Sequence, residues 1–232
     1  MKDAVKKNTA GRLLHNIDEK RVFLTDNIRS VRTEKPSLLL HACCGPCSTS
    51  VVERLSEEFN ITVFYYNPCI TDEEEYKKRK ESLIKFIEAF NNERLDPMNN
   101  TTRGVVHFME GPYNPGAFLE VCMGYENEPE GGARCTICFR QRLEKTAETA
   151  GFAGCDYFGT TLTVSPHKNY KLISEIGKEI ALRYKLAYLD RDFKKQDGFK
   201  RSIELSKQYG LYRQTYCGCC FSAGQHKEIR RK

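Results

Sequence analysis

Short apolar runs alternate along the chain with stretches of helical periodicity. Runs rich in leucine, β-branched or aromatic residues predict five strands, at residues 37–40, 61–66, 104–110, 157–162 and 186–189. Between the strands, apolar residues recur at intervals of three and four, which predicts helices over residues 48–59, 72–90, 139–150 and 172–184 and around 199–203. This alternation predicts an α/β protein with a Rossmann-like three-layer fold and a mostly parallel sheet.

The chain of 232 residues is long enough for one substantial core. We therefore predict one domain over residues 36–225, preceded by a basic N-terminal arm of residues 1–35 and followed by a basic tail of residues 226–232. Residues 1–35 carry nine Lys and Arg against five Asp and Glu, and the last twelve residues carry four against one. Because these charges gather at the termini of a chain with net charge +6, they favour a polyanionic partner.

Three thiols lie within five residues where the first predicted strand ends and a helix begins. They are Cys43, Cys44 and Cys47, in the motif HACCGPCS at residues 41–48. Backbone N–H groups at a helix start favour thiolate over thiol, and ligands of an open α/β sheet gather beyond the carboxyl ends of its strands. The loop therefore predicts metal or redox chemistry. The alternative is that these cysteines only pack or form a disulfide.

A second thiol pair, Cys135 and Cys138, has the CxxC spacing at a predicted helix start. That spacing lets two sulfurs reach one metal or one edge of a cluster. With the first loop the pair supplies five thiols, more than one tetrahedral zinc uses. An iron–sulfur cluster and a structural zinc both remain open at this point.

A third group, Cys217-Gly218-Cys219, is too tight for easy chelation of one tetrahedral ion, so a redox pair or separate roles are open. The chain has eleven cysteines, and we assign the remaining four to packing: Cys69, Cys122, Cys155 and Cys220. The sequence has no run long and apolar enough to span a bilayer and no signal-peptide core, so we expect a cytoplasmic protein without a membrane partner. It also lacks GxxxxGK[ST] and GxGxxG, so no motif supports nucleotide use.

Five motifs together carry a family resemblance. They are HACCGPCS, the Asn67-Pro68 exit of the second strand, GxRCxxCFxxRL at residues 132–143, TTLTVSPHK at 160–168 and YCGC at 216–219. In this order they resemble the cobalamin-independent epoxyqueuosine reductases of the QueH type, over residues 36–225. The resemblance implies reduction of epoxyqueuosine to queuosine at the wobble position of tRNA, with a [4Fe-4S] cluster and an adjacent second iron in a Rossmann-like fold.

The resemblance also implies roles for the cysteines. Cys135 and Cys138 are expected to bind the cluster with one first-loop cysteine, for which we choose Cys44. Cys43 and Cys47 would then face the second iron, although some family members carry Asp where this chain has Cys47. Cys217 and Cys219 match the C-terminal pair of the family, so we expect a redox-active pair able to form a disulfide.

Other residues of the expected reaction are chosen from their place at the strand ends. Candidates for the proton donor are His41, Tyr65 and Asp192, and candidates for substrate binding are Asn67, His167 and Lys168. We expect an external one-electron donor such as a ferredoxin or flavodoxin. Two other functions are considered: a tRNA thiolase or other ATP-using tRNA-modifying enzyme of similar architecture, and a zinc-bound RNA-binding module without catalysis.

Overall fold

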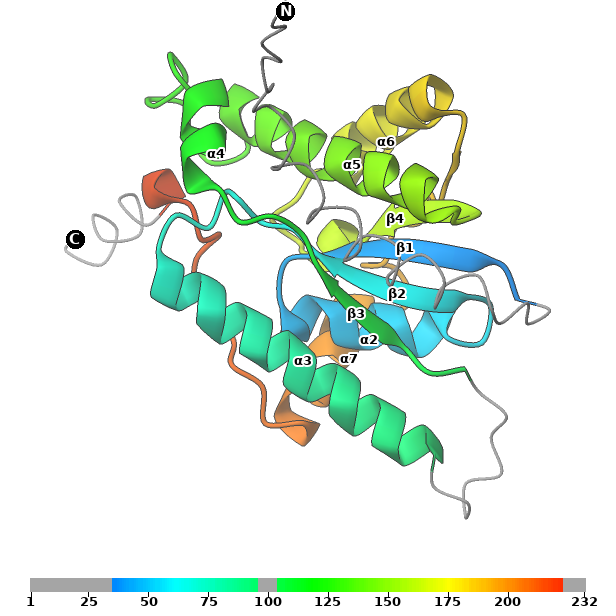
Figure 1. Cartoon of the computed structure of the whole chain (residues 1–232). Helices are drawn as coiled ribbons and strands as arrows, with labels where there is room; N and C mark the ends of the chain where they lie inside the picture. The colour runs from blue at the N-terminus through cyan, green and yellow to red at the C-terminus, as the bar shows by residue number, and fades with distance from the viewer. Residues whose placement is uncertain (1–34, 96–103, 223–232) are drawn as a thin grey trace, which may run out of the picture. The chain divides into compact units, whose positions relative to one another are not determined.

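A computed structural model describes residues 35–95 and 104–222 (Figure 1). Most of the predicted basic arm and the whole basic tail lie outside these residues, so the domain boundaries stay predictions. The chain divides into two units, residues 1–34 and 35–232, and the description below concerns the second. No helix in the described parts is long and apolar enough to cross a membrane.

The described residues form a five-stranded sheet in the order β3-β2-β1-β4-β5. Its strands are β1 (Ser37–Ala42), β2 (Asn60–Tyr65), β3 (His107–Glu110), β4 (Tyr157–Thr160) and β5 (Ala187–Tyr188). Every neighbouring pair is parallel, with Leu40 of β1 opposite Val63 of β2 and Gly159 of β4. All strand ends that carry the predicted loops therefore point to one edge of the sheet.

Helices cover both faces of the sheet, as Figure 1 shows. They are α2 (Gly45–Leu55), α3 (Glu73–Leu95), α4 (Pro115–Val121), α5 (Ala133–Ala153), the 3₁₀ helix η2 (Thr161–Val164), α6 (Tyr170–Tyr184) and α7 (Gly198–Gln208). Side chains of β1 alternate between the faces: Leu38 and Leu40 pack in the core with α2 and α3, and Leu39 packs with α5 and α6. The predicted α/β three-layer architecture is confirmed.

Capping residues explain where the helices begin and end. Asp72 accepts a hydrogen bond from the Glu75 N–H at 2.8 Å at the start of α3, and Gly154 ends α5 in the left-handed conformation. The segment after β3 is rich in Pro and Gly, yet it includes the short helix α4, because Asn114 caps it and Pro115 fits its first turn. The predicted fourth strand is also too long, since Thr160 turns the chain into η2.

Candidate metal centre

The first-loop triad, Cys43, Cys44 and Cys47, brings three sulfurs within 4.8 Å of one another. Cys44 is the N-cap residue of α2, and Gly45 follows in its first turn. A Cβ on Gly45 would lie 2.7 Å from the backbone oxygen of Ser82 in α3, so only glycine lets α2 start this close to α3. The glycine thereby fixes where the three thiols stand.

Hydrogen bonds within the triad concentrate negative charge on one sulfur. Side-chain hydrogen bonds that Cys43 shares with Cys44, sulfur to sulfur at 3.8 Å, and with Cys47 hold the pKa of Cys43 well below its usual range. The same contact raises the pKa of Cys44 to about 12 and also raises that of Cys47. The triad thus offers one thiolate, Cys43, and two thiols that a bound cation would have to deprotonate.

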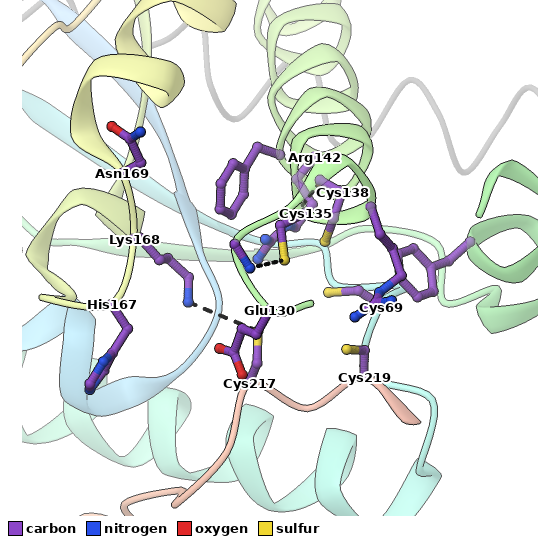
Figure 2. A pocket seen from close by; sticks show the side chains of 14 residues that line it. Cys69, Glu130, Cys135, Cys138, Arg142, His167, Lys168, Asn169, Cys217 and Cys219 are labelled. Carbon is purple, nitrogen blue, oxygen red and sulfur yellow. Dashed lines mark hydrogen bonds between the residues drawn. The ribbon is translucent and has the colours of Figure 1, made fainter. Parts of the chain in front are cut away.

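Five further thiols surround a pocket beside this loop, as Figure 2 shows. They belong to Cys69, Cys135, Cys138, Cys217 and Cys219. Both CxxC residues lie in the first turns of α5, because that helix begins at Ala133, and the Gly131 N–H donates to the Cys135 sulfur at 3.2 Å. The five predicted metal ligands therefore fall in two groups, the triad and the pocket pair.

Cys69 belongs to this pocket, although its isolated position in the sequence predicts a packing role. Its side chain is 3% exposed, and it accepts a hydrogen bond from the Cys138 thiol. That bond lowers the pKa of Cys69 and raises the pKa of Cys138. Its place directly after β2, at the edge where the strand ends meet, was the signal that could have identified it.

A buried cation faces the pocket thiols. Arg142 is 2% exposed, and its Nε donates to the Cys138 carbonyl at 3.2 Å. Among the described residues this is its one hydrogen bond; Nη2 has no partner, and no carboxylate pairs with the guanidinium. Since a buried charge needs an opposite charge nearby, the surrounding sulfurs are its compensating groups.

Lys168 adds a second cation to the lining of the pocket. Its Nζ lies 4.0 Å from the Cys217 sulfur. The neighbouring sulfur of Cys217 raises the pKa of Lys168, and Cys43 and Cys47 act in the same direction, so the lysine stays charged. Two cations and eight thiols thus share one end of the sheet, an arrangement suited to an anionic, sulfur-rich centre.

Comparison with known proteins identifies the family. The model of the family "Epoxyqueuosine reductase QueH" matches residues 38–225. The chain belongs to the QueH family. It is 42% identical to the epoxyqueuosine reductase QueH of Streptococcus pyogenes serotype M1 over 82% of this chain and 71% of the relative. It is 33% identical to the QueH protein of Thermotoga maritima over 84% of this chain and 97% of the relative.

With the QueH family established, the predicted proton donors can be placed. Both ring nitrogens of His41 are engaged, with the Thr160 hydroxyl at 3.0 Å and the Tyr66 carbonyl at 3.1 Å. Burial lowers the pKa of His41 to about 4, so its ring is neutral. Tyr65 is buried and donates to the Tyr76 carbonyl at 2.9 Å. These contacts suit structural roles, and neither residue lines the pocket.

The remaining predicted site residues of this QueH chain divide between loop contacts and the pocket. Asn67 donates to the Ala42 carbonyl at 2.8 Å and so ties the end of β2 to the end of β1. Asp192 accepts from the Lys194 backbone N–H at 3.2 Å and does not line the pocket. His167 and Lys168 do line it. Their predicted contact with substrate is untested.

The predicted redox pair of this QueH chain consists of free thiols, as do all eleven cysteines. Gly218 between Cys217 and Cys219 has φ +108°, a conformation that favours glycine. The expected disulfide stays a prediction. Cys122 and Cys155 are buried, as their predicted packing role requires, but Cys220 is exposed, so its assignment to packing was wrong.

Proposed function

We propose that this chain reduces epoxyqueuosine in tRNA to queuosine, at the sulfur-lined edge of its parallel sheet. Membership of a family of epoxyqueuosine reductases supports the oxidoreductase reaction and its place in queuosine biosynthesis. A tRNA thiolase or other ATP-using enzyme is not favoured, because the family is a reductase family. The first loop offers only Gly45 where a phosphate cradle needs several glycines.

Bound iron is the cofactor that best suits the residues present. The observation that carries this assignment is Arg142, a buried guanidinium whose Nη2 has no partner and which pairs with no carboxylate within residues 35–95 and 104–222. Iron-bound thiolates and the sulfides of a cluster are negatively charged and accept hydrogen bonds, so they can pair with the Arg142 guanidinium. A zinc bound by four thiolates is the competing occupant, so the metal must be identified by measurement.

The cysteines can be divided between a [4Fe-4S] cluster and a second, mononuclear iron. Cys135 and Cys138 are the proposed cluster ligands, with Cys44 from the first loop as the third. Cys69 joins the candidates because its sulfur contacts Cys138. Cys43 and Cys47 are left for the second iron. When bound, these groups would supply electrons one at a time and a Lewis acid for oxygen.

The chain's own residues have three tasks in such a reaction. Conversion of the epoxide to an alkene consumes two electrons and two protons and releases the oxygen as water. The thiols hold the metal, while Arg142 and Lys168 place positive charge where the oxygen becomes negative. Lys168 and His167 line the pocket wall, so they are the proposed contacts of the modified nucleoside.

The tRNA substrate and an external one-electron donor complete the proposal. A tRNA follows from the reaction of the family, and the charge of the termini supports it. The two-electron demand requires a reductant, for which a ferredoxin or flavodoxin is suitable.

The test is conversion of tRNA carrying epoxyqueuosine by anaerobically purified chain with a chemical reductant. Queuosine in the digested tRNA, together with about four or more irons per chain, would support the proposal. Cys69→Ser should remove the iron of the cluster and lower turnover by about tenfold or more, whereas Cys122→Ser, at a buried thiol outside the pocket, should change neither iron content nor turnover. A colourless protein that holds only zinc after anaerobic reconstitution would favour the RNA-binding module.

A further inference from the structure

The Cys217-Gly218-Cys219 loop is held by one side chain of α3. Arg79 donates from Nη1 to the Cys217 carbonyl at 2.9 Å and from Nη2 to the Tyr216 carbonyl at 3.1 Å. The next carbonyl, that of Gly218, accepts from the Thr71 N–H at 3.3 Å, just before α3. Three successive carbonyls of the loop are therefore fixed from one side.

Arg79 is itself locked in place. Its side chain is 1% exposed, and its Nε donates to Glu75 one turn earlier in α3, at 2.7 Å. The second oxygen of Glu75 accepts from the Tyr212 hydroxyl at 2.8 Å. The guanidinium also lies 5.4 Å from the Tyr216 ring centroid. A buried ion pair adds little net stability but can specify one arrangement of the segments it joins, and here both Tyr212 and Tyr216 belong to the C-terminal segment.

The other side of the loop is tied to the pocket wall. The Ser222 hydroxyl accepts from the Cys217 N–H at 3.4 Å and donates to Glu130 at 2.9 Å. In this position the Cys217 sulfur faces Lys168, and both Cys217 and Cys219 line the pocket with Cys69 and the CxxC pair (Figure 2).

We propose that Arg79 is a positioning residue, which holds the Cys217-Gly218-Cys219 loop so that its two thiols face the metal centre. The planar fork of an arginine reaches both carbonyls and Glu75 at once, and a lysine offers only a single ammonium. Gly218 belongs to the same device, because a Cβ there would lie 3.0 Å from Arg79 Nη1. The inference rests on the proposed redox role of these two thiols.

The test measures how fast Cys217 is alkylated in the full chain purified anaerobically, with each thiol located by mass spectrometry. All variants carry Cys220→Ser, which removes the exposed thiol next to the loop. Arg79→Lys should label Cys217 at least tenfold faster, because the loop leaves the pocket. The pH midpoint of labelling should also fall toward that of an ordinary thiol, since the buried position, despite Lys168, raises the pKa of Cys217.

Gly218→Ala disturbs the contact between the loop and Arg79 from the loop side, and it should also increase the labelling rate of Cys217. Because Gly218 has φ +108°, alanine there also strains the backbone, so the double variant should label at least as fast as either single variant. Arg94→Lys is the matched control: Arg94 is a buried arginine at the other end of α3, where it packs on the Phe90 ring and donates to Ser56, and its loss should leave Cys217 labelling unchanged.

A folded Arg79→Lys protein with the wild-type labelling rate at Cys217 would overturn the proposal. An equal increase in Arg94→Lys would also overturn it, because loss of stability alone would then explain the labelling. A wild-type chain that fails to reduce epoxyqueuosine would instead contradict the proposed function, and the labelling comparison would still stand.

Discussion

At the scale of single residues, Cys138 and Cys47 belong to different groups of sulfurs. Cys138 contacts Cys69 in the pocket, whereas Cys47 completes the first-loop triad. Cys138→Ser replaces a thiolate with a poor iron ligand and should abolish the visible cluster absorbance and all epoxide reduction. Cys47→Asp keeps an anionic ligand and should keep near-normal absorbance with altered turnover. Anaerobic absorbance spectra check both, and loss of the cluster in Cys47→Asp would place Cys47 among the cluster ligands.

Arg142 permits a second prediction at this scale. Because its charge lies among sulfurs and no carboxylate of the described segments pairs with it, Arg142 should stabilise the reduced, more negative state of a bound cluster. Arg142→Met should shift the reduction potential to more negative values by about 60 mV or more, a tenfold change for a one-electron couple. Arg140→Met is the control, since Arg140 pairs with Glu179 at the surface. A redox titration with the same midpoint in wild type and Arg142→Met would contradict this role.

At the scale of elements, the approach of α2 to α3 decides where the triad stands. Gly45→Ala would push a methyl group against the Ser82 backbone, and we expect a loss of about 1–3 kcal/mol in the free energy of unfolding. Gly151→Ala in α5 is the control: the position is exposed with open space around it, so it should gain roughly 0.5–1 kcal/mol. Urea unfolding of both variants measures the difference. Equal stability of Gly45→Ala and wild type would show that the start of α2 is not constrained.

The elements also show what the sequence could predict. Periodicity located the strands and the principal helices, because β1, β2, β4 and the long helices each bury an apolar face. Parallel strands end at one edge of the sheet, and the loops that follow these ends place Cys69, His167 and Lys168 in one pocket. The place of Cys69 among the pocket thiols was not predicted, because a cysteine outside any CxxC-type motif is more often a packing residue. The contact between Arg79 and the carbonyls of Tyr216 and Cys217 joins residues more than 130 apart, so no local pattern could reveal it.

At the scale of the whole molecule, the basic termini bear on tRNA binding. Phosphate contacts release counterions, so affinity for tRNA should fall steeply as salt rises. Deletion of residues 1–30 removes seven Lys and Arg and should weaken binding at low salt and flatten the salt dependence. Filter binding across a salt series measures both effects. Unchanged affinity at low salt would exclude the predicted arm from the tRNA site.

The central claim is that iron at the sulfur-lined edge of the sheet reduces epoxyqueuosine. The most direct test is a single turnover: the chain is purified anaerobically, reduced, freed of excess reductant and mixed with tRNA carrying epoxyqueuosine. We predict that queuosine forms while the absorbance of the oxidised metal centre returns, with one queuosine for every two electrons lost. Queuosine formed equally well by iron-free protein, or reoxidation without any queuosine, would contradict the account.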